Sequence, residues 1–272
     1  MSFTLKNDTL AQAYLHKVQG HPGVYCIALN RPRSRNAISV QLLKDIQTSL
    51  ELAINEKGLN VLIFYSSTSG SFCSGADLKE RRTMTEAQVR EFLANIRNVF
   101  NHIDDLPFPT IAAIDGPAMG GGLELALACD FRIAASEVDK ISFPEVRLGI
   151  IPGAGGTQRA PRLIGMTKAK ELIFTGKELV AHEALDLGLV DYVASPGSTA
   201  FQRALQLADE MALSAPLALR AAKAALSRSL DTPLDIALDY ELACYEPLLK
   251  TKDRVEALVA FREKRTPVFI GE

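Results

Sequence analysis

Short apolar segments, rich in branched and aromatic residues, alternate with amphipathic segments through the first half of the chain. Residues 23–30 (GVYCIALN) and 60–66 (NVLIFYS) have the length and composition of β-strands. Between them, in the segment that follows Ser39, apolar residues recur at helical spacing from Leu42 to Ile54. A strand, a helix and a strand in this order predict an α/β fold with a parallel sheet covered on both faces.

The clearest helical pattern lies in residues 85–103, where apolar side chains recur at steps of three and four until shortly before Pro107. Beyond it, residues 110–115 and 131–135 are predicted strands. Residues 120–129 lie between these strands and form a predicted short helix that opens with three glycines.

Strand patterns nearly vanish from about Gly165 onward, and helical patterns dominate, with breaks at Gly176, Pro196, Pro216 and Pro233. The sequence therefore predicts an α/β core followed by a mainly helical C-terminal region.

The composition limits the classes of function. Hydrophobic residues make up 47% and charged residues 23% of the chain, which is typical of a soluble globular protein with a large core. The formal net charge of -2 provides no overall positive field for nucleic acid or anionic lipid. No apolar run reaches the roughly 18 residues of a membrane span, and no targeting segment is visible. The cysteines and histidines are scattered, so no metal site is expected.

Glu124 is the most informative single residue. In the predicted helix, its neighbours three and four positions away are glycine, leucine and alanine, so no polar face would hold the carboxylate in water. Glu124 should therefore be buried or line a cavity, and a buried Glu is rare unless it is paired or functional. The alternative is a surface Glu that interacts favourably with the dipole in the first turn of the helix.

Glu145 follows Pro144 and a short predicted strand, residues 141–143. In a parallel sheet, the start of a helix and the end of the next strand meet at the carboxyl edge, where ligands bind, so Glu145 and Glu124 could converge. Taken alone, Glu145 fits better as an ordinary solvated loop acid.

Glycines supply a third element of a possible site: Gly70, Gly75, Gly116 and residues 120–122. Without side chains, backbone N–H groups can approach a ligand oxygen, and the N-terminus of a helix directs free donors outward. Such donors can form an oxyanion hole, although tight turns and close packing explain the same glycines equally well.

Motifs for other chemistries are missing. There is no G-x-x-x-x-G-K-[ST] loop, and two partial G-x-G-x-x-G matches end in Leu125 and Gln158 instead of a third glycine. No G-x-S-x-G elbow is present, and Cys73 has no histidine nearby in the sequence to act as its base. Nucleotide binding and covalent catalysis are therefore poorly supported.

Several ordered motifs together resemble the enoyl-CoA hydratase (crotonase) family from about Val24 to the C-terminus. They are CSGADLKE at residues 73–80, GGGLELA at 120–126, PE at 144–145, PGAGGTQR at 152–159 and FREKR at 261–265. The resemblance implies a crotonase fold, with repeated ββα units in a core of residues 1–196 and a helical oligomerisation region of residues 197–272. Trimers, often paired into hexamers, are usual in this family. The implied partners are thus an acyl-CoA substrate and further copies of the chain.

The resemblance also implies roles for individual residues. The backbone N–H groups of Ala76 and Gly121 would bind the thioester oxygen, and Glu124 and Glu145 would hold a water molecule. When water adds to the β-carbon of a conjugated thioester, negative charge develops on that oxygen, and two preorganised donors stabilise it. Glu124 is expected to act as the base and Glu145 as the acid. No metal or redox cofactor is implied, because coenzyme A is part of the substrate.

Further residues match family positions that contact the substrate or its CoA part: Arg31, Arg35, Ala37, Gly75, Asp77, Leu78, Lys79, and Lys264 from a neighbouring subunit. Arg81 and Arg82 follow closely after Ala76, so one of them could pair with a carboxylate at the end of an acyl group. Both could equally face solvent ahead of the helix that begins near Thr85.

Both carboxylate positions match a hydratase, and a Δ3,Δ2-enoyl-CoA isomerase is the alternative. Within the family, the resemblance is greatest to the methylglutaconyl-CoA hydratase branch, through the segments GADLKER and GGGLELALACD. Enzymes of this branch act in leucine degradation. The mammalian member also binds AU-rich RNA. Residues 42–57 carry only Lys44 and Lys57 in place of a lysine-rich face, so RNA binding, the alternative from another class, is not expected. The expected location is the mitochondrial matrix in a eukaryote and the cytoplasm in a bacterium.

Overall fold

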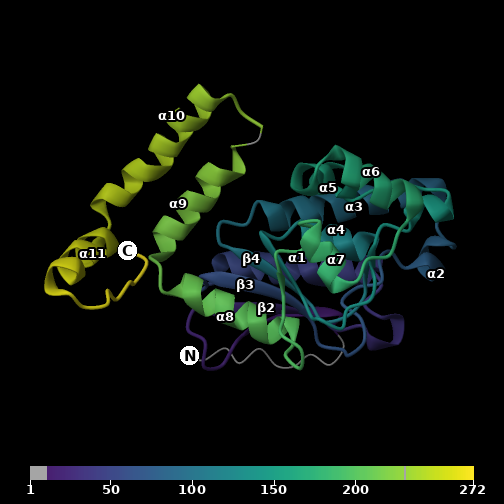
Figure 1. Cartoon of the computed structure of the whole chain (residues 1–272), viewed down its shortest axis with the longest axis horizontal. Helices are drawn as coiled ribbons and strands as arrows, with labels where there is room; N and C mark the ends of the chain where they lie inside the picture. Colours follow the sequence, from purple (N-terminus) through teal and green to yellow (C-terminus); the bar gives the residue numbers. More distant parts are fainter. Residues whose placement is uncertain (1–10, 230) are drawn as a thin grey trace.

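A six-stranded sheet forms the centre of the computed structural model, which describes residues 11–229 and 231–272 (Figure 1). In spatial order the strands are β1 (Ala13–Lys17), β2 (Val24–Leu29), β3 (Val61–Ser66), β4 (Thr110–Ile114), β6 (Phe131–Ala134) and β8 (Tyr192–Val193). Only β1 is antiparallel to its neighbour. The predicted parallel sheet is thus present, with an antiparallel strand at its edge.

The two amphipathic helices predicted in the first half of the chain begin at polar caps. Helix α1 (Val40–Asn55) starts where Ser39 Oγ accepts a hydrogen bond of 3.0 Å from Leu42 N. Helix α3 (Glu86–Asp104) starts with a capping box between Thr85 and Gln88. Both helices bury most of the apolar face that their periodicity predicts. Ile54, at the end of the predicted face of α1, is an exception, because 43% of its surface is exposed.

Helices cover both faces of the sheet. Helix α8 (Ala200–Ala212) packs across β2, β3, β4 and β6, while α1, α3 and α4 (Gly121–Leu127) lie on the other side (Figure 1). The central strands are accordingly almost continuous runs of buried apolar residues.

A second, two-stranded sheet consists of β5 (Ala118–Met119) and β7 (Ile141–Ser142), which run parallel. Strand β5 was not expected, because two residues are too few to show a periodic pattern. The remaining elements of the core are η1 (Pro32–Ser34), α2 (Leu78–Arg81), η2 (Glu145–Leu148), α5 (Gly156–Ile164), α6 (Met166–Thr175) and α7 (Ala181–Asp186).

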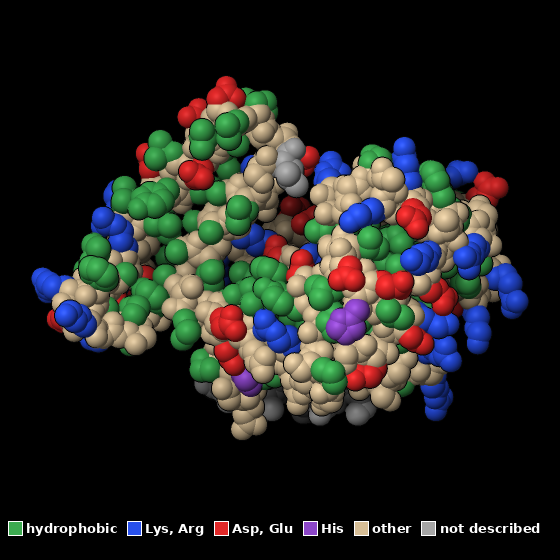
Figure 2. Space-filling view, in the orientation of Figure 1, with side chains coloured by type: hydrophobic (Ala, Val, Ile, Leu, Met, Phe, Trp, Pro, Cys, Tyr) green, Lys and Arg blue, Asp and Glu red, His purple; other side chains and the backbone are tan. Residues whose placement is uncertain are grey.

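The last helices project from the core (Figure 1) and are joined to it by Lys223, whose Nζ donates a 2.7 Å hydrogen bond to Asp130 Oδ2. They are α9 (Pro216–Ser227), α10 (Leu234–Tyr245), η3 (Glu246–Lys250) and α11 (Lys252–Glu263). The predicted boundary after residue 196 precedes α8, whose buried face belongs to the hydrophobic core, so the projecting part begins at α9. Large apolar side chains on this projecting part are exposed, including Leu234 (74%) and Phe261 (86%), as the space-filling view also shows (Figure 2).

Candidate active site

The small sheet brings Glu124 and Glu145 together. Strand β5 leads through Gly120 into α4, which carries Glu124, and β7 leads through Pro144 to Glu145 at the start of η2. Because β5 and β7 are parallel neighbours, their carboxyl ends lie at the same edge. The expected convergence therefore occurs at this second sheet and not at the edge of the six-stranded sheet.

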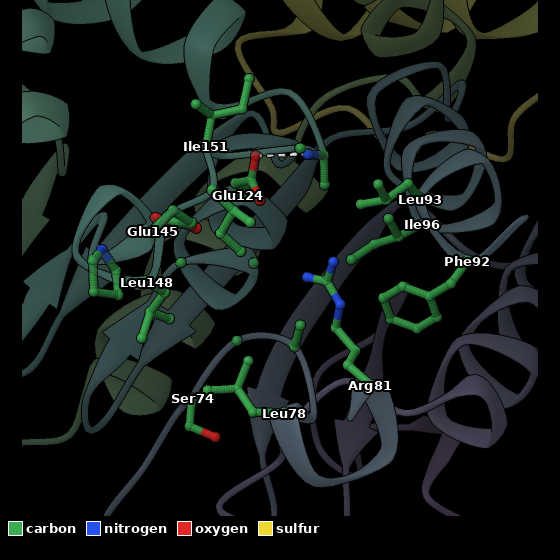
Figure 3. A pocket seen from close by; sticks show the side chains of 18 residues that line it. Ser74, Leu78, Arg81, Phe92, Leu93, Ile96, Glu124, Glu145, Leu148 and Ile151 are labelled. Carbon is green, nitrogen blue, oxygen red and sulfur yellow. Dashed lines mark hydrogen bonds between the residues drawn. The ribbon is translucent and has the colours of Figure 1, made fainter. Parts of the chain in front are cut away.

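Glu124 is buried, as its apolar neighbours predicted, with 3% of its surface exposed. Its Oε1 accepts hydrogen bonds of 2.8 Å from the backbone N–H groups of Ala154 and Gly156. Figure 3 shows the first of these two bonds. Burial raises the pKa of Glu124, and the two backbone hydrogen bonds and the charge of Arg159 oppose that increase. The side chain is thus held in one orientation by donors that favour its ionised form.

Glu145 has a different environment, although its exposed surface is also small, at 8%. Its Oε2 is buried and has no hydrogen-bond partner among the described residues. Burial raises the pKa of Glu145 to about 7, and the nearby charge of Glu124 acts in the same direction. Near neutral pH, Glu145 can therefore both hold and release a proton.

Two free backbone donors lie beside each other next to the carboxylates. The N–H of Gly121 belongs to the first residue of α4, which has no acceptor within its own helix. The N–H of Ala76 donates no hydrogen bond within the described part of the chain. A Cβ atom placed on Gly121 would lie 3.6 Å from Ala76 N, so the two donors are close neighbours.

Glycine is required at position 75 to bring these donors together. Gly75 has a φ of +86°, a left-handed conformation that favours glycine. A Cβ atom here would lie 2.8 Å from the carbonyl oxygen of Met119 and 3.4 Å from Gly121 N. A side chain at position 75 would thus disrupt the contact between the two segments.

The donors and carboxylates line one cavity of about 440 Å³ (Figure 3). Most of its wall is apolar and comes from α3 and from residues 148–154; Phe92, Leu93, Ile96, Leu148 and Ile151 are labelled in the figure. A cationic side chain, that of Arg81 of α2, also extends into the cavity, whereas Arg82 is exposed. Such a cavity suits an apolar group that carries a few polar atoms.

Some of the residues expected to contact the substrate line the cavity, and others are exposed on the surface. Gly75 and Leu78 line the cavity. Lys79, the next residue after Leu78, is exposed, as is Arg35, whose carbonyl oxygen accepts a 3.1 Å hydrogen bond from Ser74 N. Lys264 caps the end of α11, at the opposite end of the molecule from α2 (Figure 1), so only the Lys264 of another copy could reach this cavity.

The other three residues expected to contact the substrate are joined through Arg31, which binds both Ala37 and Asp77. Arg31 Nη1 donates to Ala37 O and to Asp77 Oδ2, both at 2.7 Å. Their assignment as CoA contacts stays a prediction.

The partners of Glu124 were not predicted. Ala154 and Gly156 belong to the PGAGGTQR motif, but no role was expected for either residue. The described residues contain no group of three or more His, Cys, Asp or Glu side chains that could hold a metal ion. Among those same residues, no helix is long and apolar enough to cross a membrane.

The sequence profile of a family described as "Enoyl-CoA hydratase/isomerase" matches residues 19–272. The chain belongs to the enoyl-CoA hydratase/isomerase family. It is 57% identical over 257 residues to the enoyl-CoA isomerase/hydratase fer4 of Mycosarcoma maydis, which covers 92% of this chain and 93% of that protein. It is 46% identical over 260 residues to the mitochondrial methylglutaconyl-CoA hydratase of Mus musculus, covering 94% of this chain and 82% of the relative.

The structural comparison confirms the crotonase fold of this family member. The crystal structure of an enoyl-CoA hydratase from Bacillus anthracis matches with a TM-score of 0.91 at 45% identity, covering 96% of this chain and 100% of the other. The protein is therefore an enzyme of the enoyl-CoA hydratase family.

Proposed function

We propose that this enzyme adds water across the 2,3 double bond of a 2-enoyl-CoA thioester. The observation that carries the proposal is that two buried carboxylates, Glu124 and Glu145, and the residues of two backbone donors, Ala76 and Gly121, line the same cavity. No metal or redox cofactor is needed for this reaction.

The environments of the two carboxylates support different roles. Glu124, held by two N–H donors, is suited to act as the ionised base that takes a proton from water as the water oxygen bonds to C3. Glu145, with a pKa of about 7, is suited to give a proton to C2. The Ala76 and Gly121 donors stabilise the negative charge on the thioester oxygen between these two events.

For the acyl group, we propose a short chain that ends in a carboxylate, as in methylglutaconyl-CoA. Arg81 supports this choice, because its guanidinium lies in a mainly apolar cavity and has no ion-pair partner among the described residues. A cation in such a place can bind a carboxylate through charge-assisted hydrogen bonds. Crotonyl-CoA has no group for Arg81 to bind.

Replacing Arg81 by Met should leave crotonyl-CoA turnover nearly unchanged and weaken methylglutaconyl-CoA turnover by about 1.5–3 kcal/mol, the usual contribution of a charged hydrogen bond. Initial rates on both thioesters would measure the difference. Arg82→Met is the matched control, because Arg82 is the adjacent arginine and is exposed. If the ratio of kcat/KM for methylglutaconyl-CoA to kcat/KM for crotonyl-CoA were the same in wild type and in Arg81→Met, Arg81 would not select a carboxylated substrate. The enzyme would then be a general short-chain hydratase.

We further propose that the enzyme forms trimers or hexamers through α9–α11, whose exposed apolar side chains support burial against another copy. Lys264 of a neighbouring subunit would then contact the CoA phosphates together with Lys79. For a eukaryote we propose a location in the mitochondrial matrix, which is supported by relatives whose names describe them as mitochondrial, and for a bacterium we propose the cytoplasm.

Charge reversal at Lys79 or Lys264 should raise KM for an acyl-CoA several-fold more than KM for the same acyl group on pantetheine. The reason is that pantetheine lacks the adenosine phosphates that these exposed lysines would bind. Steady-state kinetics on the two thioesters would measure this. The same rise in KM on both would show that neither lysine contacts the nucleotide part.

A further inference from the structure

Arg31 joins the segment that contains Ala37 to Asp77, the residue that follows the proposed oxyanion donor Ala76. It lies between β2 and η1, and its Nη1 donates 2.7 Å hydrogen bonds to Ala37 O and to Asp77 Oδ2. The Arg31 and Asp77 side chains are only 21% and 11% exposed. This ion pair is therefore shielded from the solvent screening that weakens pairs at the surface.

The two joined segments fix the donor Ala76 from both sides. Ile38 N donates to Gly75 O at 2.7 Å, and Asp77 N donates to Ile38 O at 3.0 Å. Ala76 is the residue between these two bonds, and its own N–H has no acceptor in the described chain. The direction of that N–H thus depends on how Ile38 sits against residues 75–77.

Asp77 also connects Arg31 to the start of α2. Its Oδ1 accepts hydrogen bonds from Lys79 N (3.0 Å) and Glu80 N (3.2 Å), while its Oδ2 binds Arg31. Burial acts to raise the pKa of Asp77, but the hydrogen bonds from Arg31 and from the start of α2 outweigh it, so the pKa lies below its usual value. Asp77 is therefore ionised and holds Arg31 at neutral pH.

We infer that Arg31 and Asp77 form a clamp that positions the Ala76 N–H for the thioester oxygen. Both are positioning residues that act through Ala76, in contrast to the CoA contacts that their sequence positions suggested. The inference deepens the proposed hydration and rests on it. It predicts that Arg31 affects the polarisation of the thioester carbonyl and not the affinity for the nucleotide part of CoA.

The kinetic test compares Arg31→Met and Asp77→Asn with Arg33→Met, a matched control because Arg33 is an exposed arginine of η1, two residues after Arg31. We expect kcat to fall about 10- to 100-fold in both clamp variants, since a misplacement of about 1 Å can cost about 10²-fold. The fall should be the same for crotonyl-CoA and crotonyl-pantetheine. The double variant should be no slower than the slower single variant, because the two side chains act as one unit.

A spectroscopic test reports the carbonyl directly. The absorption of bound 2,4-hexadienoyl-CoA should shift to longer wavelength in wild type and Arg33→Met, because hydrogen bonds polarise its conjugated carbonyl. The shift should be reduced in Arg31→Met and Asp77→Asn. If Arg31→Met does not fold, Asp77→Asn carries the test, because asparagine can still cap α2.

An unchanged shift together with a KM that rises only for the CoA thioester would overturn the clamp and make Arg31 a CoA contact. That outcome would leave the proposed hydration intact. If wild-type protein binds the thioester but does not hydrate it, the proposed function is wrong. The spectral comparison between wild type and the variants would still test the clamp in that case.

Discussion

Glu124→Gln and Glu145→Gln should each lower the rate of crotonyl-CoA hydration by about 10²–10⁴-fold, the usual contribution of a general acid or base. Glutamine keeps the size of the side chain and can still accept the hydrogen bonds that Glu124 receives from Ala154 and Gly156. It cannot take up or release the proton. Stopped-flow or steady-state rates on purified variants would measure the effect.

Folding provides the control for this pair of variants. Burial raises the folded-state pKa of both glutamates above that of an unfolded chain, so their contribution to stability is greatest at low pH. For Glu145 that contribution is lost as the pH rises through about 7. Thermal unfolding above pH 7 should therefore find Glu145→Gln at least as stable as wild type, and Glu124→Gln should remain folded because its side chain can still accept both backbone hydrogen bonds. If both Gln variants fold but keep more than about a tenth of the wild-type hydration rate, the two-carboxylate mechanism is wrong.

Gly121→Pro should lower kcat by about 10²–10³-fold, the usual loss when one oxyanion donor is removed. Position 121 is the first residue of α4, where proline is tolerated in a helix, and the preceding residue is the permissive Gly120. The substitution removes the N–H that would bind the thioester oxygen. Rates with crotonyl-CoA at saturating concentration would measure the loss.

Gly121→Ala is the matched control, because it adds a Cβ atom and keeps the N–H. That Cβ would lie 3.1 Å from Cδ1 of Ile38, at the flexible end of a side chain that can move by a few tenths of an ångström. We expect this variant to retain most of the activity. Equal losses in the proline and alanine variants would assign the effect to crowding and not to the missing donor.

The sequence predicted the parts of the fold that depend on periodic patterns. Helix α3 shows this best, because a capping residue and a repeated apolar face determine its start and its packing. The burial of Glu124 was also predictable, because glycine, leucine and alanine surround it on α4. Local patterns were sufficient in both cases.

The geometry of the site required the tertiary structure. The two-residue strands β5 and β7 bring the carboxylates together, and strands this short leave no pattern in a sequence. The donors to Glu124 lie 30 and 32 residues away, and they are backbone groups that any residue type but proline could supply. Arg31 illustrates a further limit, because a sequence does not distinguish an arginine paired inside the protein from one that awaits a ligand.

The fate of solvent atoms tests the proposed hydration most directly. The enzyme would be incubated with crotonyl-CoA in ¹⁸O-labelled D₂O, and the product would be examined by mass spectrometry and NMR. We predict a 3-hydroxyacyl-CoA with one ¹⁸O at C3 and one deuterium at C2, formed at a rate that falls in Glu124→Gln and Glu145→Gln. An unsaturated product that gains deuterium but no ¹⁸O, with its double bond moved to C3, would contradict hydration and show an isomerase.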